Sequence, residues 1–174
     1  MAEGGRVDLV HLTDGENSLR IGVLGRRMPG VLPWHDFLDV EVVVTSAFAH
    51  GRLEVCLAPT DLDDWAQVLG ELAAGRSATW MDDGRNPGIR FASSGQDGVA
   101  VVVVEDVAGS GTSVRVPVRV AGGWTDELEE RLGHVRAAWP QEAVETAPGA
   151  YEWRRARAYR PRTDGTPEAV GRVV

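Results

Sequence analysis

The stretch DFLDVEVVVTSAFAHGRLEVCLAP, residues 36–59, decides the fold, because apolar and polar side chains alternate along both of its halves. In the first half the valines at even positions share one face, while Asp39 and Glu41 share the other. Alternation with a period of two is typical of a β-strand with one buried face. We therefore predict two strands, at 37–46 and 52–58, that pair antiparallel across a turn.

The register of this pair is constrained by the same alternation. Keeping both apolar sets on one side requires that the numbers of paired residues sum to an odd value. A turn at 47–50 makes that sum 97, which places Val44 opposite Leu53 and Glu41 opposite Cys56. A slip by one residue would turn every valine to solvent, so the pairing is a sharp prediction.

A helix is predicted over the next segment, TDLDDWAQVLGELAAG, residues 60–75. Thr60 is the expected N-cap, three aspartates follow in the first turn, and Gly75 ends the helix. Four apolar residues recur at intervals of three and four and form one stripe: Leu62, Trp65, Leu69 and Leu72. This stripe predicts that the helix lies across the apolar face of the sheet.

Working outward, alternation and turn signals predict strands at 7–12, 18–24, 78–82, 89–93, 99–105 and 112–120, and a second helix at 125–139. The predicted fold is α+β, a curved, mostly antiparallel β-sheet with two helices packed on one face, in the order ββββα-ββββα. After four strands the sheet either continues or folds over, and the repeated order suggests a degenerate internal repeat. The length predicts one domain at 1–153. Residues 154–174 hold six arginines without periodicity and are expected to form a flexible Arg-rich C-terminal tail.

The composition excludes some function classes. All 18 basic residues are arginine, so without lysine the chain can form neither a Schiff base nor a Walker-type phosphate loop. The net charge of -8 is uneven, with 12 arginines and 23 acids at 1–149 but six arginines and three acids at 150–174. An acidic body disfavours nucleic acid and attracts basic protein partners, whereas the tail alone could contact RNA or DNA.

The chain is expected to be cytoplasmic. The single cysteine, Cys56, rules out an internal disulfide, and the N-terminus lacks the layout of a signal peptide. The longest apolar run, 99–104, has six residues, whereas a membrane-spanning helix needs about 20. We expect no membrane contact and no cofactor.

The His35-Asp36 pair could belong to a metal-binding set of histidines and aspartates. The residues that could complete this set are His11, His50, Asp82, Asp83 and His134. However, the pair precedes a strand, and no partner lies at the spacing that metal ligands adopt on helices or in CxxC motifs. A loop or strand-capping role is the favoured interpretation, and no metal site and no catalytic residue are predicted.

Two further clusters could contact a partner. Asp39, Glu41 and Glu54 lie on the outward strand face and form either an acid-base pair or a solvated acidic docking surface, of which we favour the second. The segment WMDDGRNPG at 80–88 is a tight turn or a recognition loop. The candidate partner-binding residues are Trp34, His35, Asp36, Asp39, Glu41, Glu54, Trp80, Asp82, Asp83 and Arg85. Cys56, expected beside Glu41, should be a poor nucleophile.

Four motifs together resemble an uncharacterised actinobacterial family, domain of unknown function 5959 (DUF5959). They are GRRMPGVLPWHDFLDVEVVVTSAFAHGRLEVCLAPTDLDDWAQVLGELAAG, WMDDGR, RLGHVRAAWP and TAPGAYEWR. That resemblance implies no reaction and no catalytic residue. More distantly, residues 36–120, which begin with a strand pair and a helix, are similar in pattern to WapI-type immunity proteins, small cytosolic proteins that bind and neutralise a toxin. The basic tail departs from that pattern.

These observations favour a non-catalytic protein-binding module that uses the acidic sheet surface and the loops at 25–36 and 80–88, with an immunity-like role as one form of it. One alternative is a small-molecule-binding protein or enzyme with a pocket lined by His35 and Asp36. A second alternative is contact with nucleic acid through the Arg-rich tail.

Overall fold

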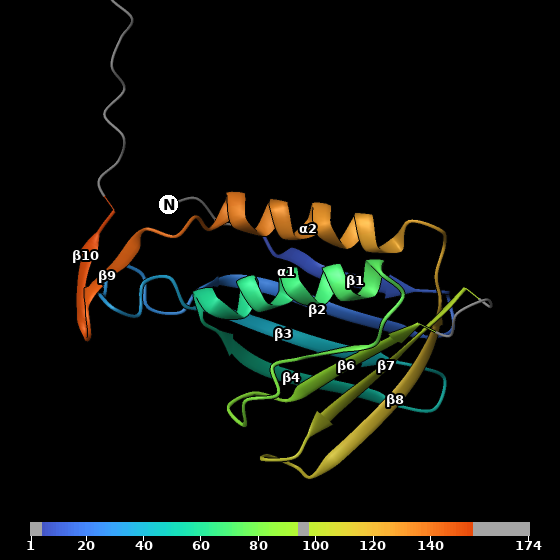
Figure 1. Ribbon diagram of the computed structural model, residues 1–174. Helices are drawn as coiled ribbons and strands as arrows, with labels where there is room; N and C mark the ends of the chain where they lie inside the picture. The colour runs from blue at the N-terminus through green and yellow to red at the C-terminus, as the bar shows by residue number, and fades with distance from the viewer. Residues whose placement is uncertain (1–4, 94–97, 155–174) are drawn as a thin grey trace, which may run out of the picture.

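The computed structural model describes residues 5–93 and 98–154 and contains two four-stranded antiparallel sheets, two helices and a hairpin (Figure 1). The first unit consists of β1 (Val7–Thr13), β2 (Ser18–Arg26), β3 (Leu38–Thr45), β4 (His50–Leu57) and α1 (Pro59–Ala73). The second consists of β5 (Ala78–Trp80), β6 (Gly88–Ser93), β7 (Val99–Asp106), β8 (Thr112–Arg119) and α2 (Trp124–Ala138). The hairpin β9 (Ala143–Ala147) and β10 (Ala150–Trp153) follows. The α+β class, the antiparallel pairing and the ββββα-ββββα order are confirmed.

The strands form two separate sheets instead of one continuous curved sheet. Their orders are β1-β2-β3-β4 and β5-β6-β7-β8, so the chain leaves the first sheet at β4 and starts a second after α1. Both sheets have one strongly apolar face, represented by Val42 in β3 and Val102 in β7, and these side chains belong to the same core. In one open sheet, only the two helices could cover the apolar face. With two sheets, the apolar face of each also covers that of the other.

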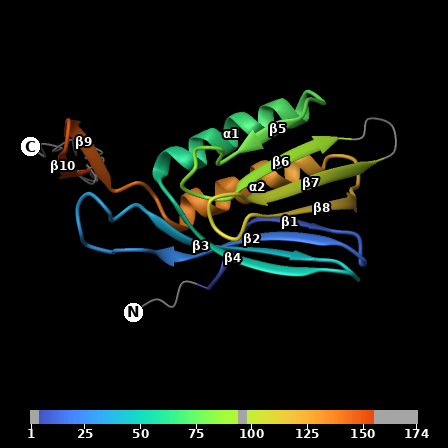
Figure 2. The ribbon, with the colours of Figure 1, turned by 90° about the horizontal axis from the view of Figure 1, so that it is seen from below.

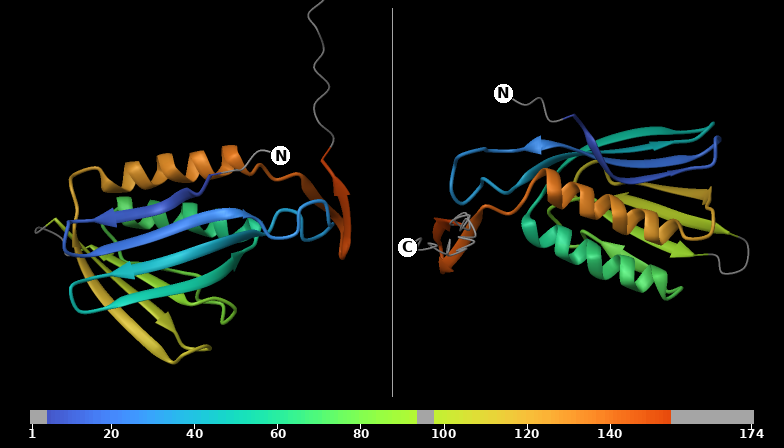
Figure 3. Two further views of the ribbon diagram at one scale, coloured as in Figure 1. Left: turned by 180° about the vertical axis from the view of Figure 1, so that it is seen from behind. Right: turned by 90° about the horizontal axis from the view of Figure 1, so that it is seen from above.

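The two helices lie side by side and cover the core that the sheets enclose, as Figures 2 and 3 show. Each helix packs mainly on the first strand of the other unit, α1 on β5 and α2 on β1. The core-facing stripe of α1 is as predicted, with Trp65 and Leu69 completely buried. Trp65 packs on Trp80 and Phe91, with ring centroids 4.9 and 5.2 Å away.

The pairing of β3 with β4 keeps the predicted parity but differs in register by two residues. Paired numbers sum to 95, so Val42 lies opposite Leu53 and Glu41 lies opposite Glu54. The turn comprises residues 46–49, where the Ser46 hydroxyl accepts the Ala49 N–H at 3.0 Å. Because this side chain closes the turn early, the following residue already belongs to the strand. The predicted sum of 97 is therefore wrong, although the even-numbered valines of β3 face the core as predicted.

The start of α1 also differs from the prediction. Ala58 is the N-cap in place of Thr60, and Pro59 is the first helical residue. The Asp61 carboxylate accepts the Ala58 N–H at 2.6 Å. A proline at the first helical position with an acid two residues later favours this start, because proline needs no N–H partner there.

The hairpin β9–β10 was not predicted, because residues 140–153 show little apolar alternation. Its turn contains Gly149 with φ of +75°, a conformation that favours glycine. Figure 1 shows the hairpin at one end of the molecule, beside the loop that joins β2 to β3. The predicted tail lies outside the described residues except for Arg154, whose N–H donates to the Glu142 carbonyl. Among the described residues, the helices are too short or too polar to cross a membrane.

Candidate functional site

The loop that joins β2 to β3, residues 27–37, is fastened to the C-terminal hairpin by Asp36. Its carboxylate is 7% exposed and accepts the backbone N–H groups of Glu142 and Ala143 at 2.9 and 2.7 Å. It also pairs with the Arg26 guanidinium. Burial alone would raise the pKa of Asp36, but these three donors hold that pKa below its usual value. The predicted capping role of this residue therefore extends to a distant part of the chain.

His35 is part of the same attachment. Its Nδ1 accepts the Gly30 N–H at 2.7 Å, which places the proton of the neutral ring on Nε2, 2.6 Å from Glu142 Oε2. The ring also contacts Trp153 edge to face, with centroids 4.7 Å apart. Both ring nitrogens are engaged and the residue is 8% exposed. His35 and Asp36, the residues that would line the pocket of an enzyme, thus have a structural role in attaching the loop to the hairpin.

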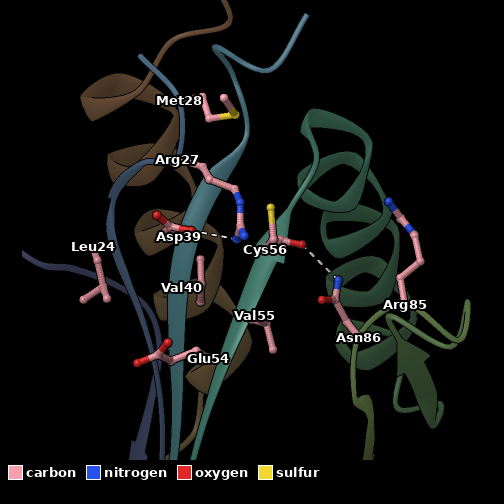
Figure 4. A pocket seen from close by; sticks show the side chains of 10 residues that line it. All are labelled: Leu24, Arg27, Met28, Asp39, Val40, Glu54, Val55, Cys56, Arg85 and Asn86. Carbon is pink, nitrogen blue, oxygen red and sulfur yellow. Dashed lines mark hydrogen bonds and ion pairs between the residues drawn. The ribbon is translucent and has the colours of Figure 1, made fainter. Parts of the chain in front are cut away.

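A groove of 770 Å³ begins at this loop and runs along the adjoining part of the first sheet (Figure 4). It lies between loop 27–37 and the loop after β5, residues 81–87, which the fold brings together. Its lining residues are Leu24, Arg27, Met28, Asp39, Val40, Glu54, Val55, Cys56, Arg85 and Asn86. We call this feature the sheet groove. It unites three of the predicted residues, Asp39, Glu54 and Arg85.

Polar contacts hold the two sides of the sheet groove. Arg27 pairs with Asp39 at 3.1 Å, and both side chains remain about half exposed. On the other side, Asn86 Nδ2 donates to the Cys56 carbonyl at 3.0 Å and attaches loop 81–87 to the free edge of β4 (Figure 4). The groove therefore offers donors and acceptors of both charges to a ligand.

Cys56 lies at the centre of the sheet groove. Burial raises the pKa of its thiol, Arg27 opposes that rise, and the carboxylates of Asp39 and Asp61 reinforce it. A raised pKa keeps the thiol protonated near neutral pH and lowers its reactivity. The expected low nucleophilicity thus has another cause than the one predicted, since Glu41 faces Glu54 and not Cys56.

The outer face of the first sheet is not the open acidic surface that the sequence predicts. Glu41 is 6% exposed, because Arg6 and Arg52 contact its carboxylate at 2.5 and 2.6 Å. Arg6 reaches it by crossing Gly22, where an added Cβ would lie 2.2 Å from the Arg6 Nε. Strand parity placed Glu41 outside correctly, but residues from neighbouring strands cover it.

Trp80 is also placed differently from its predicted role. It is 1% exposed, and its Nε1 donates to the Asp61 carbonyl at 2.8 Å. It has the inward parity of β5 and belongs to the core, so its assignment as an exposed anchor is wrong. Asp82, Asp83 and Arg85 in loop 81–87 are exposed as expected.

Asp61 is a charged residue that sequence reasoning counted only as part of a helix start. It is 5% exposed and lies 3.3 Å from Arg85, in a groove of 480 Å³ between α1 and loop 81–87. Burial raises the pKa of this carboxyl, with added effects of Asp83 and Asp64, while the Ala58 N–H and Arg85 oppose the rise. The only feature of the sequence that pointed to Asp61 was its position in the first turn of the predicted helix.

Exposed apolar side chains gather at the same end of the molecule. Leu24 and Met28 line the sheet groove and are each 43% exposed. Trp34, a predicted contact residue, is 47% exposed and packs on Phe37. Val31 in the same loop and Trp153 beside His35 complete this set. We call these five residues, Leu24, Met28, Val31, Trp34 and Trp153, the apolar end.

A search for metal ligands and three comparisons with known proteins complete the description of the site. Within residues 5–93 and 98–154, no group of three or more His, Cys, Asp or Glu side chains is arranged to hold a metal ion. No curated protein and no solved structure matches the chain significantly. One family model, DUF5959, described as a family of unknown function, matches residues 7–140. That match covers both ββββα units and ends before the hairpin, so the chain belongs to the DUF5959 family.

Proposed function

We propose that this protein is a non-catalytic protein-binding module whose partner docks on the apolar end and the adjoining sheet groove. The observation that carries the proposal is the position of the exposed apolar side chains. Seven large ones are exposed in the described part of the chain, and five of them form the apolar end. Apolar side chains gathered in one place and rimmed by polar ones are typical of interaction surfaces.

The residue types at this end fit such an interface. Trp34 supplies a large apolar surface, and Arg27 and Arg85 supply guanidinium groups on the two sides of the sheet groove. Tryptophan and arginine are enriched among the residues that dominate binding energy. The contacts of His35 and Asp36 hold loop 27–37 in place. A loop that is already ordered loses less entropy on binding than a free one.

The contact surface differs from the acidic surface expected at first. Since Glu41 is covered, the surface offered to the partner is mixed, with Asp39 and Glu54 as its acidic part. An immunity-like role, in which the partner is a toxin, is the finer part of the proposal. Its support is the similarity in pattern of residues 36–120 to WapI-type immunity proteins.

Affinity capture with a matched control tests the docking surface. The tagged protein is incubated with native lysate, and retained proteins are identified by mass spectrometry at moderate salt. A stoichiometric partner should be retained by the unmodified protein and lost by the double variant Met28→Ala with Trp34→Ala. The control is Phe48→Ala, which removes the fully exposed Phe48 from the β3–β4 turn at the other end of β3.

Three outcomes would count against this assignment. Equal retention by both variants would remove the apolar end as the docking surface, and so would loss of binding by Phe48→Ala. A partner that is lost only when residues 155–174 are deleted would favour the tail instead. The unfolding temperatures of both variants should equal that of the unmodified protein, so that any loss of binding reflects the surface and not the fold.

A small-molecule ligand is the second candidate function, because the sheet groove has the volume of a drug-sized binding site. A thermal-shift screen of metabolites tests it. A compound that raises the unfolding temperature, and does so less in Arg27→Ala, would favour this alternative over a protein partner.

A further inference from the structure

The outward face of the second sheet differs in charge from the rest of the molecule. Arginines 90, 115 and 119 project from β6 and β8 and are exposed. Between them lie Val101 and Val103 of β7, which are half-buried and buried. Val102 and Val104 point inward and belong to the core. Val101 and Val103 alternate with them, so they point to the outer face of the sheet.

Among the described residues, the arginines of this face have no carboxylate within 4.0 Å, unlike most other arginines. The described residues include 13 arginines, and nine of them have a carboxylate within 4.0 Å. In that part of the chain the other four are Arg90, Arg115, Arg119 and Arg154, and three of these lie on this one face. In a protein of net charge -8, three arginines on one surface that have no described carboxylate within 4.0 Å favour an acidic partner there.

The pairing of the strands sets the geometry. Val103 lies directly between Arg90 and Arg115, because it pairs with Arg90 in β6 and with Arg115 in β8. Two strand spacings separate the arginine backbones, which is about 10 Å. A shallow groove of 590 Å³ follows this row and is lined by Ser77, Arg90, Ala92, Val101, Val103, Glu105, Ser113 and Arg115.

We propose that this face binds an extended acidic segment of a partner protein. Carboxylates of that segment pair with Arg90 and Arg115, and an apolar side chain between them covers Val101 and Val103. In an extended segment, side chains at every second position project from the same face, so two carboxylates four residues apart, about 13 Å, can meet the flexible guanidinium ends of Arg90 and Arg115 while the side chain midway between them covers the valines. Paired guanidinium and carboxylate groups form strong, oriented hydrogen bonds.

Two other occupants fit this face less well. The chain's own residues 155–174 contain five arginines and two acids, so their charge is repelled by the face. Single-stranded nucleic acid is usually held by aromatic side chains on which bases stack. The described lining of the groove includes no aromatic residue on which bases could stack. The proposal concerns the second sheet and is independent of docking at the apolar end.

A titration with defined probes tests the proposal. The probe is a fluorescein-labelled peptide of eight residues in which glutamate and valine take turns at every second position and serine occupies the others. Its binding is followed by fluorescence anisotropy and by the amide chemical shifts of isotope-labelled protein. Shifts should concentrate in β6, β7 and β8. The double variant Arg90→Glu with Arg115→Glu should bind at least about tenfold more weakly, because two charge-assisted pairs become repulsive.

The matched control is Arg76→Glu with Arg136→Glu, which changes the net charge equally but alters arginines that already have partners. It should bind within about twofold of the unmodified protein, because exposed pairs elsewhere contribute little. Absence of binding, shifts outside the second sheet, or equal loss in the control would overturn the proposal. Tighter binding of an oligothymidine of eight nucleotides would assign the face to nucleic acid instead. If the glutamate variant does not fold, Arg90→Gln with Arg115→Gln should still weaken the peptide about fivefold.

Discussion

His35 and Glu142 are separated by 107 residues in the sequence, yet the His35 Nε2 and the Glu142 Oε2 lie 2.6 Å apart. This contact joins the loop after β2 to the segment that leads into β9. Together with the Asp36 contacts it places the C-terminal hairpin beside the apolar end. The surface that we assign to a partner is therefore built from both ends of the chain.

Replacing Asp36 with alanine should destabilise the protein by about 3 to 5 kcal/mol. The variant leaves the Arg26 guanidinium with only its longer contact to Glu142, at 3.3 Å, and it leaves the Glu142 and Ala143 N–H groups without their acceptor. Breaking a buried pair has a cost of this size. Denaturant unfolding gives the free energy, and hydrogen exchange should show faster exchange at both amides. The control is Asp39→Ala, which breaks a half-exposed pair and should cost less than about 1 kcal/mol. A loss as small as that of the control would show that the hairpin is held by other contacts.

Asp36 should also contribute to acid unfolding. The pKa of its carboxyl is lower in the folded protein than the value of about 3.9 for an unperturbed aspartate. A lowered folded-state pKa adds stability that is present above the unfolded pKa and is lost as pH falls through the folded pKa. The free energy of unfolding should therefore decrease below about pH 4, and less steeply in Asp36→Asn. Identical slopes in the two proteins would contradict the assigned pKa direction.

Gly22→Ala should weaken the coverage of Glu41. A Cβ at this position would meet the Arg6 Nε at 2.2 Å, so the arginine must move. We expect a loss of about 1 to 3 kcal/mol, the usual cost of overpacking. In the Arg6→Ala background the same substitution should cost less, because the colliding group is gone. Gly51→Ala in β4 serves as the control, since a Cβ there has no neighbour within 4 Å.

Trp65→Ala should cost about 3 to 5 kcal/mol, as expected for a large aromatic side chain removed from a core. Trp65 is completely buried between Trp80 and Phe91, whereas Trp34 is 47% exposed. Trp34→Ala is the matched control and should cost much less. Chemical unfolding of both variants makes the comparison, and similar losses would contradict the core assignment.

The Cys56 thiol should react slowly with iodoacetamide at neutral pH. Burial raises its pKa, so the rate should reach half its maximum at a higher pH than for an unstructured cysteine peptide. Arg27→Ala should move this midpoint higher still, because Arg27 lowers the thiol pKa in the native protein. Arg136→Ala should leave the midpoint in place. A midpoint below that of the peptide would show that the thiol is activated.

Local patterns predicted most elements of the fold, because burial follows strand parity and helix periodicity. Val40 and Val42 face the core, and so do Trp65 and Leu69, as their spacing requires. Alternation alone did not predict the register of β3 and β4, because a hydrogen bond to the Ser46 hydroxyl shortens the turn. The division into two sheets depends on how distant apolar faces cover one another, which alternation within a strand does not express.

The candidate site was less predictable than the fold. Asp39, Glu54 and Arg85 were named from their exposure, and the structure brings them into one groove. Glu41 was misjudged because its cover comes from Arg6, whose path depends on the missing side chain of Gly22. Glu142 and Ala143, which connect His35 and Asp36 to the hairpin, lie more than a hundred residues away in the sequence, so no local spacing indicates these contacts.

The exchange of helices between the two units has a consequence for how the chain folds. β1 packs against α2, and about 110 residues separate them, so the first strand leaves the ribosome roughly 5 to 20 s before its cover is synthesised. Contacts this distant slow folding. Neither half can bury its apolar surface alone, because α1 serves the second half and α2 serves the first. A nascent chain truncated before Trp124 would keep β1 uncovered, a state that invites chaperone binding or pairing with another chain.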